Sequence, residues 1–192
     1  RQFAAGGPYA EGGALGGTVY LMDTRKDEYV TIRNTEGMPV KIQYLTNAEV
    51  LVLYDTYAAV YDTADGTELY RYSYGGRTLQ SAAISAGKNA VLLFGDGVHG
   101  ALTQLTIQDA TLSEAGSADV NERASGVAAS RTGAFVLTND GVLSYGLDGV
   151  FYGATVTEAK PLAMVNGRKL LLLEQGEVSV FEPPAPPSAS AG

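Results

Sequence analysis

The sequence predicts an all-β chain whose short antiparallel strands recur in sets of four, as in a β-propeller. Helix signals are nearly absent, because no stretch sustains apolar residues at i, i+3, i+4 and i+7. Short apolar runs alternate instead with turn residues, including Asp-Gly at 65–66, 96–97, 140–141 and 148–149 and Asn-Gly at 166–167. These dipeptides adopt positive φ at little cost and close tight hairpins. We therefore expect a meander of antiparallel strands.

The length of the repeat points to propeller blades. In each set the second strand is the most apolar run, and Leu51, Leu92, Val136 and Leu171 occupy equivalent points at spacings of 41, 44 and 35 residues. A strand buried on both faces is typically a continuous apolar run. Four short strands in roughly 40 residues is typical of one blade, which needs neighbouring blades to cover its faces.

The phase of the repeat defines the expected blades. Two strands are expected before the first complete set, at 18–22 and 28–33, and residues 3–5 are interpreted as the remnant of a third. We expect residues 1–182 to form a propeller portion, with a partial blade at 1–33, full blades at 38–73, 79–115 and 124–157, and a three-stranded last blade at 160–182. Residues 183–192 are rich in Pro, Ala and Ser and are expected to form a disordered tail.

The incomplete sets at the two ends leave two interpretations. The strand that would close the last blade is expected upstream of Arg1, so we interpret the chain as about four blades, the C-terminal half of a larger propeller of about seven or eight blades. The alternative is a closed four-bladed ring in which 28–33 completes the last blade. The leftover strand at 18–22 counts against that ring.

The composition removes several classes of chemistry. Cys and Trp are absent and His99 is the single histidine, so disulfides, thiolate nucleophiles and Cys-ligated metals cannot occur. With 13 Lys+Arg against 21 Asp+Glu the net charge is -8, which disfavours nucleic acid as a partner. No apolar run in this segment reaches the roughly 18 residues that a membrane span needs. We expect no cofactor and no metal.

The candidate site residues lie in connections between strands. His99 follows Asp96 in a Gly-rich hairpin, on the rim where ligands of propellers usually bind. It is interpreted either as a general base or metal ligand beside Asp96, or as a solvated turn residue. Tyr74, Arg77, Arg123 and Asp140 complete the ligand-binding candidates. The arginines are dispersed and predict no anion patch.

Three other patterns have a structural and a functional interpretation. The 12 tyrosines, seven of them within 44–74, form either a recognition surface for sugars or peptides, or strand packing. The Gly-rich segment 6–17 lacks the Lys-Ser/Thr and the following helix of a phosphate-binding loop, so we expect a mobile rim loop. Asp62 and Asp65 are interpreted as turn formers, because the acidic residues lack the spacing of a calcium loop.

Two stretches carry a resemblance to known propellers. Residues 51–54, 59–62 and 65–69 resemble the blade motif of quinoprotein-like and WD40-like propellers, without the Trp-Asp ending or quinone-binding signatures. Residues 83–85, 91–97 and 102–105 resemble the C-terminal half of a Firmicutes propeller family of unknown function, and the resemblance covers about 18–182. Members of that family often carry a membrane helix ahead of the propeller. The resemblance therefore implies an extracytoplasmic domain that is anchored by a membrane helix upstream of this segment.

These patterns predict a non-enzymatic binding or scaffolding domain that recognises a protein, peptide or glycan through one rim. The alternative is a propeller-type glycosidase or lyase that uses rim acids and His99. A deep pocket holding two carboxylates, or His99 with an acid, would favour the enzyme. A shallow rim rich in Tyr would favour binding.

Overall fold

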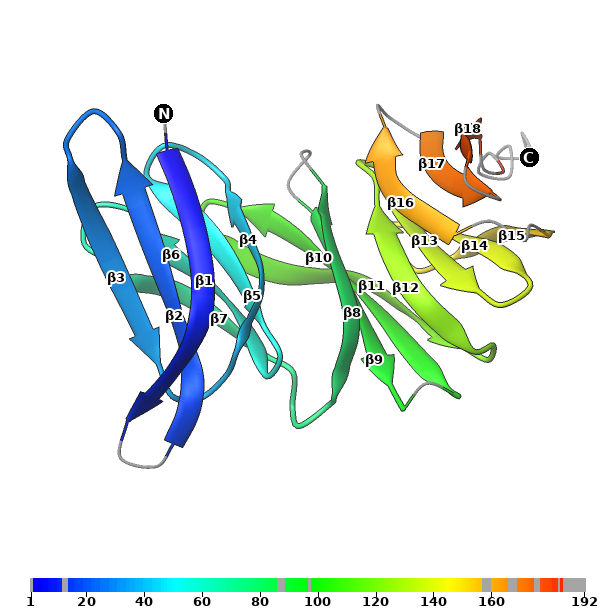
Figure 1. Ribbon diagram of the computed structural model, residues 1–192. Coiled ribbons are helices and arrows are strands. Elements are labelled where there is room, and N and C mark those ends of the chain that lie inside the picture. Colours follow the sequence, from blue (N-terminus) through cyan, green and yellow to red (C-terminus); the bar gives the residue numbers. More distant parts are fainter. Residues whose placement is uncertain are drawn as a thin grey trace. The chain divides into compact units, whose positions relative to one another are not determined.

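The computed structural model describes residues 2–11, 14–85, 89–96, 98–156, 160–165, 169–174, 177–182 and 184. Within these ranges the regular secondary structure is entirely β, arranged as five antiparallel sheets of consecutive strands (Figure 1). The predicted all-β class with four-stranded antiparallel sheets is confirmed. The chain divides into two compact units, Arg1–Leu79 with Ile107–Leu112, and Gln80–Thr106 with Ser113–Gly192.

The first unit contains a three-stranded and a four-stranded sheet. The first sheet has the order β1-β2-β3, with β1 at Gln2–Glu11, β2 at Ala14–Asp23 and β3 at Glu28–Asn34. The second has the order β4-β5-β6-β7, with β4 at Pro39–Tyr44, β5 at Glu49–Tyr54, β6 at Tyr57–Asp62 and β7 at Glu68–Ser73. Each strand pairs with its neighbour in sequence, as expected for hairpins joined by short turns.

The prediction of a mobile rim loop at 6–17 is wrong, because most of this segment forms strands. Gly6 and Gly7 belong to β1 and pair with Val19 and Thr18 of β2. The glycines of β2 have a packing reason. A Cβ on Gly16 would collide with the backbone of Asn34, and one on Gly17 with the ring of Pro39. Glycine in a strand often marks such a close approach, which sequence pattern alone does not separate from a flexible loop. Gly12 and Gly13 lie outside the described residues.

The core of the first unit lies between its two sheets. Valine and leucine side chains from the first sheet pack against a face of the second sheet that is rich in tyrosine, and the buried members are Val19, Leu21, Ile32, Val50, Val52, Tyr54, Tyr57, Ala59 and Tyr61. Full burial of one such side chain contributes roughly 1.5–3 kcal/mol. The predicted continuous apolar strand, β5, is buried along almost its whole length.

The second unit holds most of three further sheets. The third sheet has the order β11-β10-β9-β8, from β8 (Leu79–Ser85), β9 (Asn89–Gly95), β10 (Gly100–Gln108) and β11 (Thr111–Val120). The fourth comprises β12 (Ala124–Ala129), β13 (Gly133–Thr138), β14 (Gly141–Gly146) and β15 (Phe151–Val156). The fifth comprises β16 (Lys160–Val165), β17 (Lys169–Glu174) and β18 (Glu177–Phe181).

Two core clusters hold these sheets together. The third and fourth sheets share a cluster that includes Val91, Leu93, Leu102, Val136 and Tyr145. The fourth and fifth sheets share a second cluster, made of Ala128, Phe135, Leu137, Val142, Leu170 and Leu172. The fourth sheet, which has two apolar faces, is thus covered by the third and the fifth sheets, and such packing between neighbours is how repeat architectures gain stability.

Several predicted turns form as expected. Gly66 and Gly149 have φ of 77° and 81°, the left-handed region that glycine enters without strain. Asp62 and Asp65 are turn formers, since the Asp62 Oδ1 accepts a bond from the Ala64 amide at 2.7 Å and the Asp65 Oδ1 one from the Thr67 amide at 2.8 Å. The turns expected at Gly97 and Gly167 lie outside the described residues, as does the expected tail apart from Pro184.

Candidate functional site

The predicted site residues Tyr74 and Arg77 lie together in the link that follows β7. The Arg77 Nε donates to the Tyr74 carbonyl oxygen at 2.9 Å, and its Nη2 lies 3.4 Å from the hydroxyl of Tyr72. The Tyr74 side chain is only 1% exposed, and burial raises its pKa above the usual range. Tyr74 is therefore a buried residue, while Arg77 is exposed and held to the link by its guanidinium.

Asp96 and His99 lie in the turn between β9 and β10. The Asp96 Oδ1 accepts bonds from the backbone amides of Val98, at 2.9 Å, and His99, at 3.1 Å. These amides lower the pKa of Asp96, with a smaller contribution from the charge of His99. The contacts of the carboxylate are thus with the backbone of its own turn, a common role for Asp. The side chain of His99 is exposed.

Arg123 and Asp140 are exposed positions of the second unit. Arg123 precedes β12, and Asp140 lies in the turn between β13 and β14. The Asp140 amide donates to the Thr138 Oγ1 at 3.3 Å. In the part of the chain that the structure describes, no hydrogen bond or ion pair joins these two residues to each other, to Asp96 or to His99. The expected ligand-binding role of the six candidates remains a prediction.

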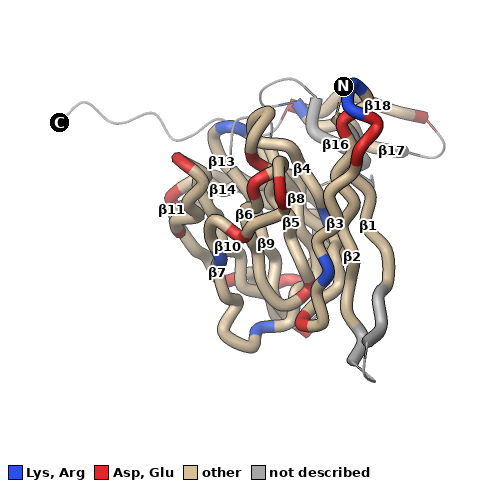
Figure 2. Tube along the Cα trace, turned by 90° about the vertical axis from the view of Figure 1, so that its left-hand side faces the viewer, with Lys and Arg blue, Asp and Glu red and all other residues tan. Residues whose placement is uncertain are grey.

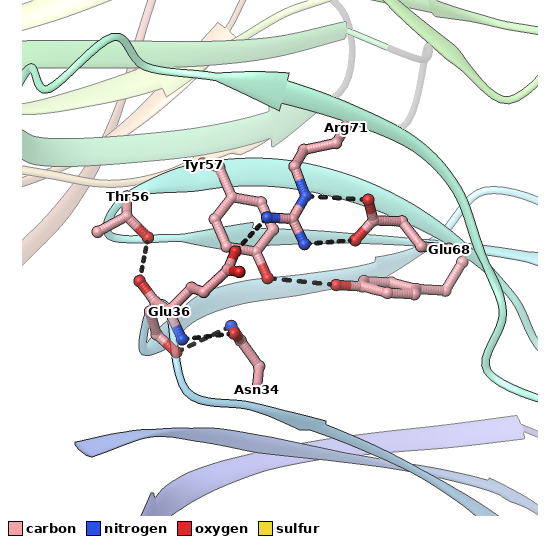
Figure 3. Close-up of polar contacts among 8 residues, drawn as sticks. Asn34, Glu36, Thr56, Tyr57, Glu68 and Arg71 are labelled. Carbon is pink, nitrogen blue, oxygen red and sulfur yellow. Dashed lines mark hydrogen bonds and ion pairs between the residues drawn. The ribbon is translucent and has the colours of Figure 1, made fainter. Parts of the chain in front are cut away.

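The most developed polar cluster lies in the first unit, around Arg71 of β7 (Figure 3). Its guanidinium forms a two-pronged ion pair with Glu68, from Nε to Oε1 at 2.9 Å and from Nη2 to Oε2 at 2.8 Å. The Nη1 is bonded to Glu36, in the link between β3 and β4. The carbon of the guanidinium lies 4.0 Å from the centroid of the Tyr57 ring. We call Glu36, Tyr57, Glu68 and Arg71 the Arg71 clamp.

A β-bulge places the two β7 members of the clamp together. Residues three apart on a regular strand point to opposite faces. The register of β6 and β7 shifts here, so that Val60 pairs with Tyr70 and Tyr61 pairs with Glu68. The extra residue in β7 brings Glu68 to the face that carries Arg71, because bulges redirect side chains in this way.

Other polar contacts hold the link that supplies Glu36. The Asn34 Oδ1 accepts a bond from the Glu36 amide at 2.7 Å, and the Asn34 Nδ2 donates to the Gly37 carbonyl oxygen at 3.1 Å. From the turn after β5, the Thr56 hydroxyl donates to the Glu36 carbonyl oxygen at 2.8 Å, as Figure 3 shows. The Asp55 Oδ1 accepts a bond from the Met38 amide at 2.8 Å. The clamp and these contacts together fasten the first sheet to the second.

Two further buried tyrosines, Tyr54 and Tyr61, lie beside Tyr57 of the clamp. The rings of Tyr54 and Tyr57 stack with centroids 4.6 Å apart, and the hydroxyls of Tyr57 and Tyr61 lie 3.5 Å from each other. Burial raises the pKa of all three hydroxyls, so they stay protonated at neutral pH. Neutral, buried phenols suit packing better than acid–base chemistry. For these tyrosines the structural interpretation holds.

A groove of about 390 Å³ lies within the first unit, at the end of its sheets where the β2–β3, β4–β5 and β6–β7 turns occur. Its walls combine an aromatic and sulfur-containing part, Met22, Tyr29 and Tyr44, with the charged side chains Asp23, Arg25, Lys26, Glu28 and Asp62. Figure 2 shows acidic and basic positions side by side in the β2–β3 turn, near the N-terminal end. This mixed lining was not expected from the sequence, because its parts come from separate turns.

Hydrogen bonds fix the shape of the groove. The Asn47 carbonyl oxygen accepts bonds from the Gln2 Nε2 at 2.9 Å and from the Thr63 Oγ1 at 2.8 Å, which ties three segments together. Asp23 and Arg25 form a two-pronged ion pair, with Nη2 to Oδ2 at 2.7 Å. This pairing holds the pKa of Asp23 well below its usual range. Tyr29 remains 64% exposed, so its ring is available to a ligand.

The described residues contain neither a candidate metal site nor a helix that could span a membrane. No group of three or more His, Asp or Glu side chains in these ranges is placed to hold a metal ion. No helix in the same ranges is long and apolar enough to cross a membrane.

Comparisons with known proteins support the fold and leave the site open. No family model matches the chain, and no curated protein matches it. A protein of unknown function from Bacteroides caccae superposes with a TM-score of 0.54 and 12% identity, over 86% of this chain and 69% of that chain. The C-terminal WD40 domain of Sif2 superposes with a TM-score of 0.61 and 14% identity, over 88% of this chain and 52% of that domain.

At these identities the likeness shows the fold alone. The chain spans about half the length of the WD40 domain, and its sheets are blades of the β-propeller type. The WD40-like part of the predicted resemblance is therefore supported. The Firmicutes family, the quinoprotein-like repeat and the membrane anchor stay predictions.

Proposed function

We propose that this chain is a recognition module that binds a peptide segment of a protein partner in the groove of its first unit. One observation carries the proposal: Met22, Arg25, Tyr29 and Tyr44 line a single groove. Tyr, Met and Arg are the side chains enriched at the centres of protein interfaces, and Tyr and Arg are frequent binding hot spots. The likeness to a WD40 domain supports a scaffold of this general kind.

The groove also suits a peptide on electrostatic grounds. Asp23 and Arg25 neutralise each other, which leaves Lys26, Glu28 and Asp62 as charges of both signs around the exposed Tyr29 ring. A peptide can match such a pattern with its own side chains, and charge matching selects partners and their orientation. Binding through the expected rim, at Asp96, His99 and the links, remains a second location for the same function.

A glycosidase or lyase has less support. Of the three groove carboxylates, Asp23 is paired with Arg25, Asp62 accepts a bond from the Ala64 amide, and Glu28 is the third. His99 lies in the second unit, in a turn whose acid, Asp96, accepts bonds from backbone amides. No described observation favours that chemistry over binding.

Selection from a library of random displayed peptides tests the proposal. Peptides enriched on the wild-type chain should bind Tyr29→Ser at least about tenfold more weakly, because loss of one hot-spot tyrosine costs about 2 kcal/mol or more. Asp62→Lys should shift the charge preference of the selected peptides. His99→Ala serves as the matched control and should bind them like the wild type. Selection of no peptide, or of peptides that bind Tyr29→Ser equally well, would overturn the proposal.

A further inference from the structure

Two buried amide side chains extend from the third sheet toward the fourth. Asn89 begins β9 and Gln104 lies within β10, and their exposed fractions are 2% and 0%. Val91 and Leu102, two residues away on the same strands, belong to the core between these two sheets. Because side chains alternate along a strand, Asn89 and Gln104 lie on that same face. Both amides are therefore polar groups in an apolar interface, where only hydrogen bonds offset the cost of burial.

Each amide nitrogen has a backbone acceptor in the fourth sheet or its turns. The Asn89 Nδ2 donates to the Ser130 carbonyl oxygen at 2.6 Å, and the Gln104 Nε2 donates to the Gly146 carbonyl oxygen. These acceptors fix the orientation of both amides, because rotating either one by half a turn would place its oxygen against a carbonyl oxygen. The amide oxygens thus point away from the acceptors that hold the nitrogens.

The two amides meet at one place in the interface. Ser130 occupies the turn between β12 and β13, and its amide donates to the Gly133 carbonyl oxygen at 2.9 Å. Gly133 begins β13 and pairs with Gly146 at the end of β14, so both acceptors lie at the same end of the fourth sheet. On the third sheet, the register of β9 and β10 makes Asn89 and Gln104 diagonal neighbours, within reach of each other for long side chains.

The two amide oxygens are buried acceptors without a donor in the described part of the chain. Neither the Asn89 Oδ1 nor the Gln104 Oε1 has a hydrogen-bond partner there. A buried acceptor that lacks a donor destabilises the folded state. Internal water molecules commonly supply such donors where two or more polar groups surround them. One water molecule has two donor hydrogens, which matches the two amide oxygens.

We propose that one internal water molecule binds between the third and fourth sheets and donates to the Asn89 Oδ1 and the Gln104 Oε1. Apolar contact is non-directional, whereas hydrogen bonds need a defined alignment of their groups. The hydrated amide pair therefore fixes how the third sheet is aligned on the fourth. The site lies in the second unit and the peptide groove in the first, so the two proposals can fail separately.

NMR of the unchanged chain tests for the water molecule directly. A long-lived internal water gives a nuclear Overhauser effect to nearby protons whose sign is opposite to that of fast surface water. The side-chain amide protons of Asn89 and Gln104 should both show this effect. The matched control is Gln43, an exposed residue whose Nε2 also donates to a carbonyl oxygen, that of Tyr44, and it should show only the signal of surface water.

A double-mutant cycle tests whether the two amides share one occupant. Asn89→Leu and Gln104→Met replace the amides with apolar groups of similar size, and each should lower the melting temperature. The double variant should lose clearly less than the sum of the two shifts, because either substitution alone removes one of the two acceptors of the water. Gln104→Met combined with Ser144→Ala is the control. Ser144 is a buried hydroxyl that pairs with Phe135, on the face toward the fifth sheet, so these two shifts should add.

Three outcomes would overturn the proposal. The first is an Overhauser effect at Asn89 and Gln104 no different from that at Gln43. The second is a crystal structure of the chain in which the two amides bond directly to each other or hold a cation. The third is a fully additive loss in the Asn89→Leu/Gln104→Met pair. If one variant fails to fold, the Overhauser measurement on the unchanged chain decides.

Discussion

The guanidinium of Arg71 lies over the ring of Tyr57, with its carbon 4.0 Å from the ring centroid. The same group pairs with Glu68 on its own strand and with Glu36 in the link between two sheets. One cation thus neutralises two carboxylates from different segments while its flat side covers a buried phenol. Arginine suits this position better than lysine, because its planar fork can stack and pair at the same time.

Replacement of Arg71 tests this relationship. Arg71→Ala should lower the free energy of unfolding by about 1–2 kcal/mol, since it removes the cation–π contact and leaves two carboxylates without their cation. Arg71→Lys should restore only part of that loss. Arg25→Ala is the matched control, because it breaks an exposed ion pair that water and salt screen, and it should lower the free energy of unfolding clearly less than Arg71→Ala does. Urea unfolding measures all three, and equal losses for Arg71→Ala and Arg25→Ala would contradict the clamp.

Alkaline pH should expose the buried tyrosines. The pKa values of Tyr54, Tyr57 and Tyr61 are raised above the usual value of 10.0 by burial, so the unfolded chain loses these protons at lower pH than the folded chain does. Their contribution to stability is therefore present below about pH 10 and is lost as pH rises toward the folded pKa values.

The ultraviolet absorbance of tyrosinate follows this transition. Exposed tyrosines such as Tyr29 should titrate first, and the buried group should titrate only with unfolding, seen by circular dichroism. Tyr61→Phe should reduce the steepness of the alkaline loss. A single smooth titration of all tyrosines in a folded chain would show that the cluster is open to solvent.

Acid should weaken the turns through their carboxylates. The pKa values of Asp23, Asp65 and Asp96 are all lowered in the folded chain, by Arg25 at the first and by backbone amides at the other two. A lowered pKa gives stability that is present above the unfolded value, about 3.9, and is lost as pH falls below it. Asp23→Asn should flatten the acid side of the stability curve. An unchanged curve would mean that the ion pair with Arg25 does not form in solution.

The strand glycines offer a matched pair of substitutions. Gly17→Ala should destabilise the first unit by about 1–3 kcal/mol, because its new methyl group collides with the Pro39 ring and packed cores do not absorb added volume. Gly7→Ala, on the neighbouring strand, has no heavy atom within 4 Å of the added carbon and should be close to neutral. Thermal melts compare the two, and similar effects would argue against the close approach of β2 to Pro39.

Asn34 is a further position where stability should respond to substitution. Asn34→Ala removes an acceptor from the Glu36 amide and a donor from the Gly37 carbonyl oxygen, at a cost of about 1–2 kcal/mol. Asn34→Asp keeps the acceptor but adds a negative charge near Glu36, so it should rescue little. Hydrogen exchange of the Glu36 amide measures the local effect. Unchanged exchange in Asn34→Ala would contradict the assigned bond.

The sequence predicted the strands better than the site. The continuous apolar run predicts β5 and the Asp-Gly dipeptide predicts the turn at Gly66, because both signals depend on neighbouring residues. The Gly-rich segment 6–17 was wrongly predicted to be a loop. A single sequence does not distinguish a glycine in a flexible loop from a strand glycine that packs against a proline ring. The Arg71 clamp was missed because Glu68 and Arg71 share a face only through a bulge. The groove was missed because Gln2, Asn47 and Thr63 are distant in sequence.

In the described part of the chain, every sheet consists of strands that follow one another in sequence, and none of these strands crosses over to a distant sheet. A stretch of DNA that encodes one sheet can therefore be duplicated or deleted in frame without changing the strand pairing of the other sheets. Families built in this way can change length by whole modules during evolution. Natural variants of this chain should accordingly differ in size by steps of about 40 residues, one repeat at a time.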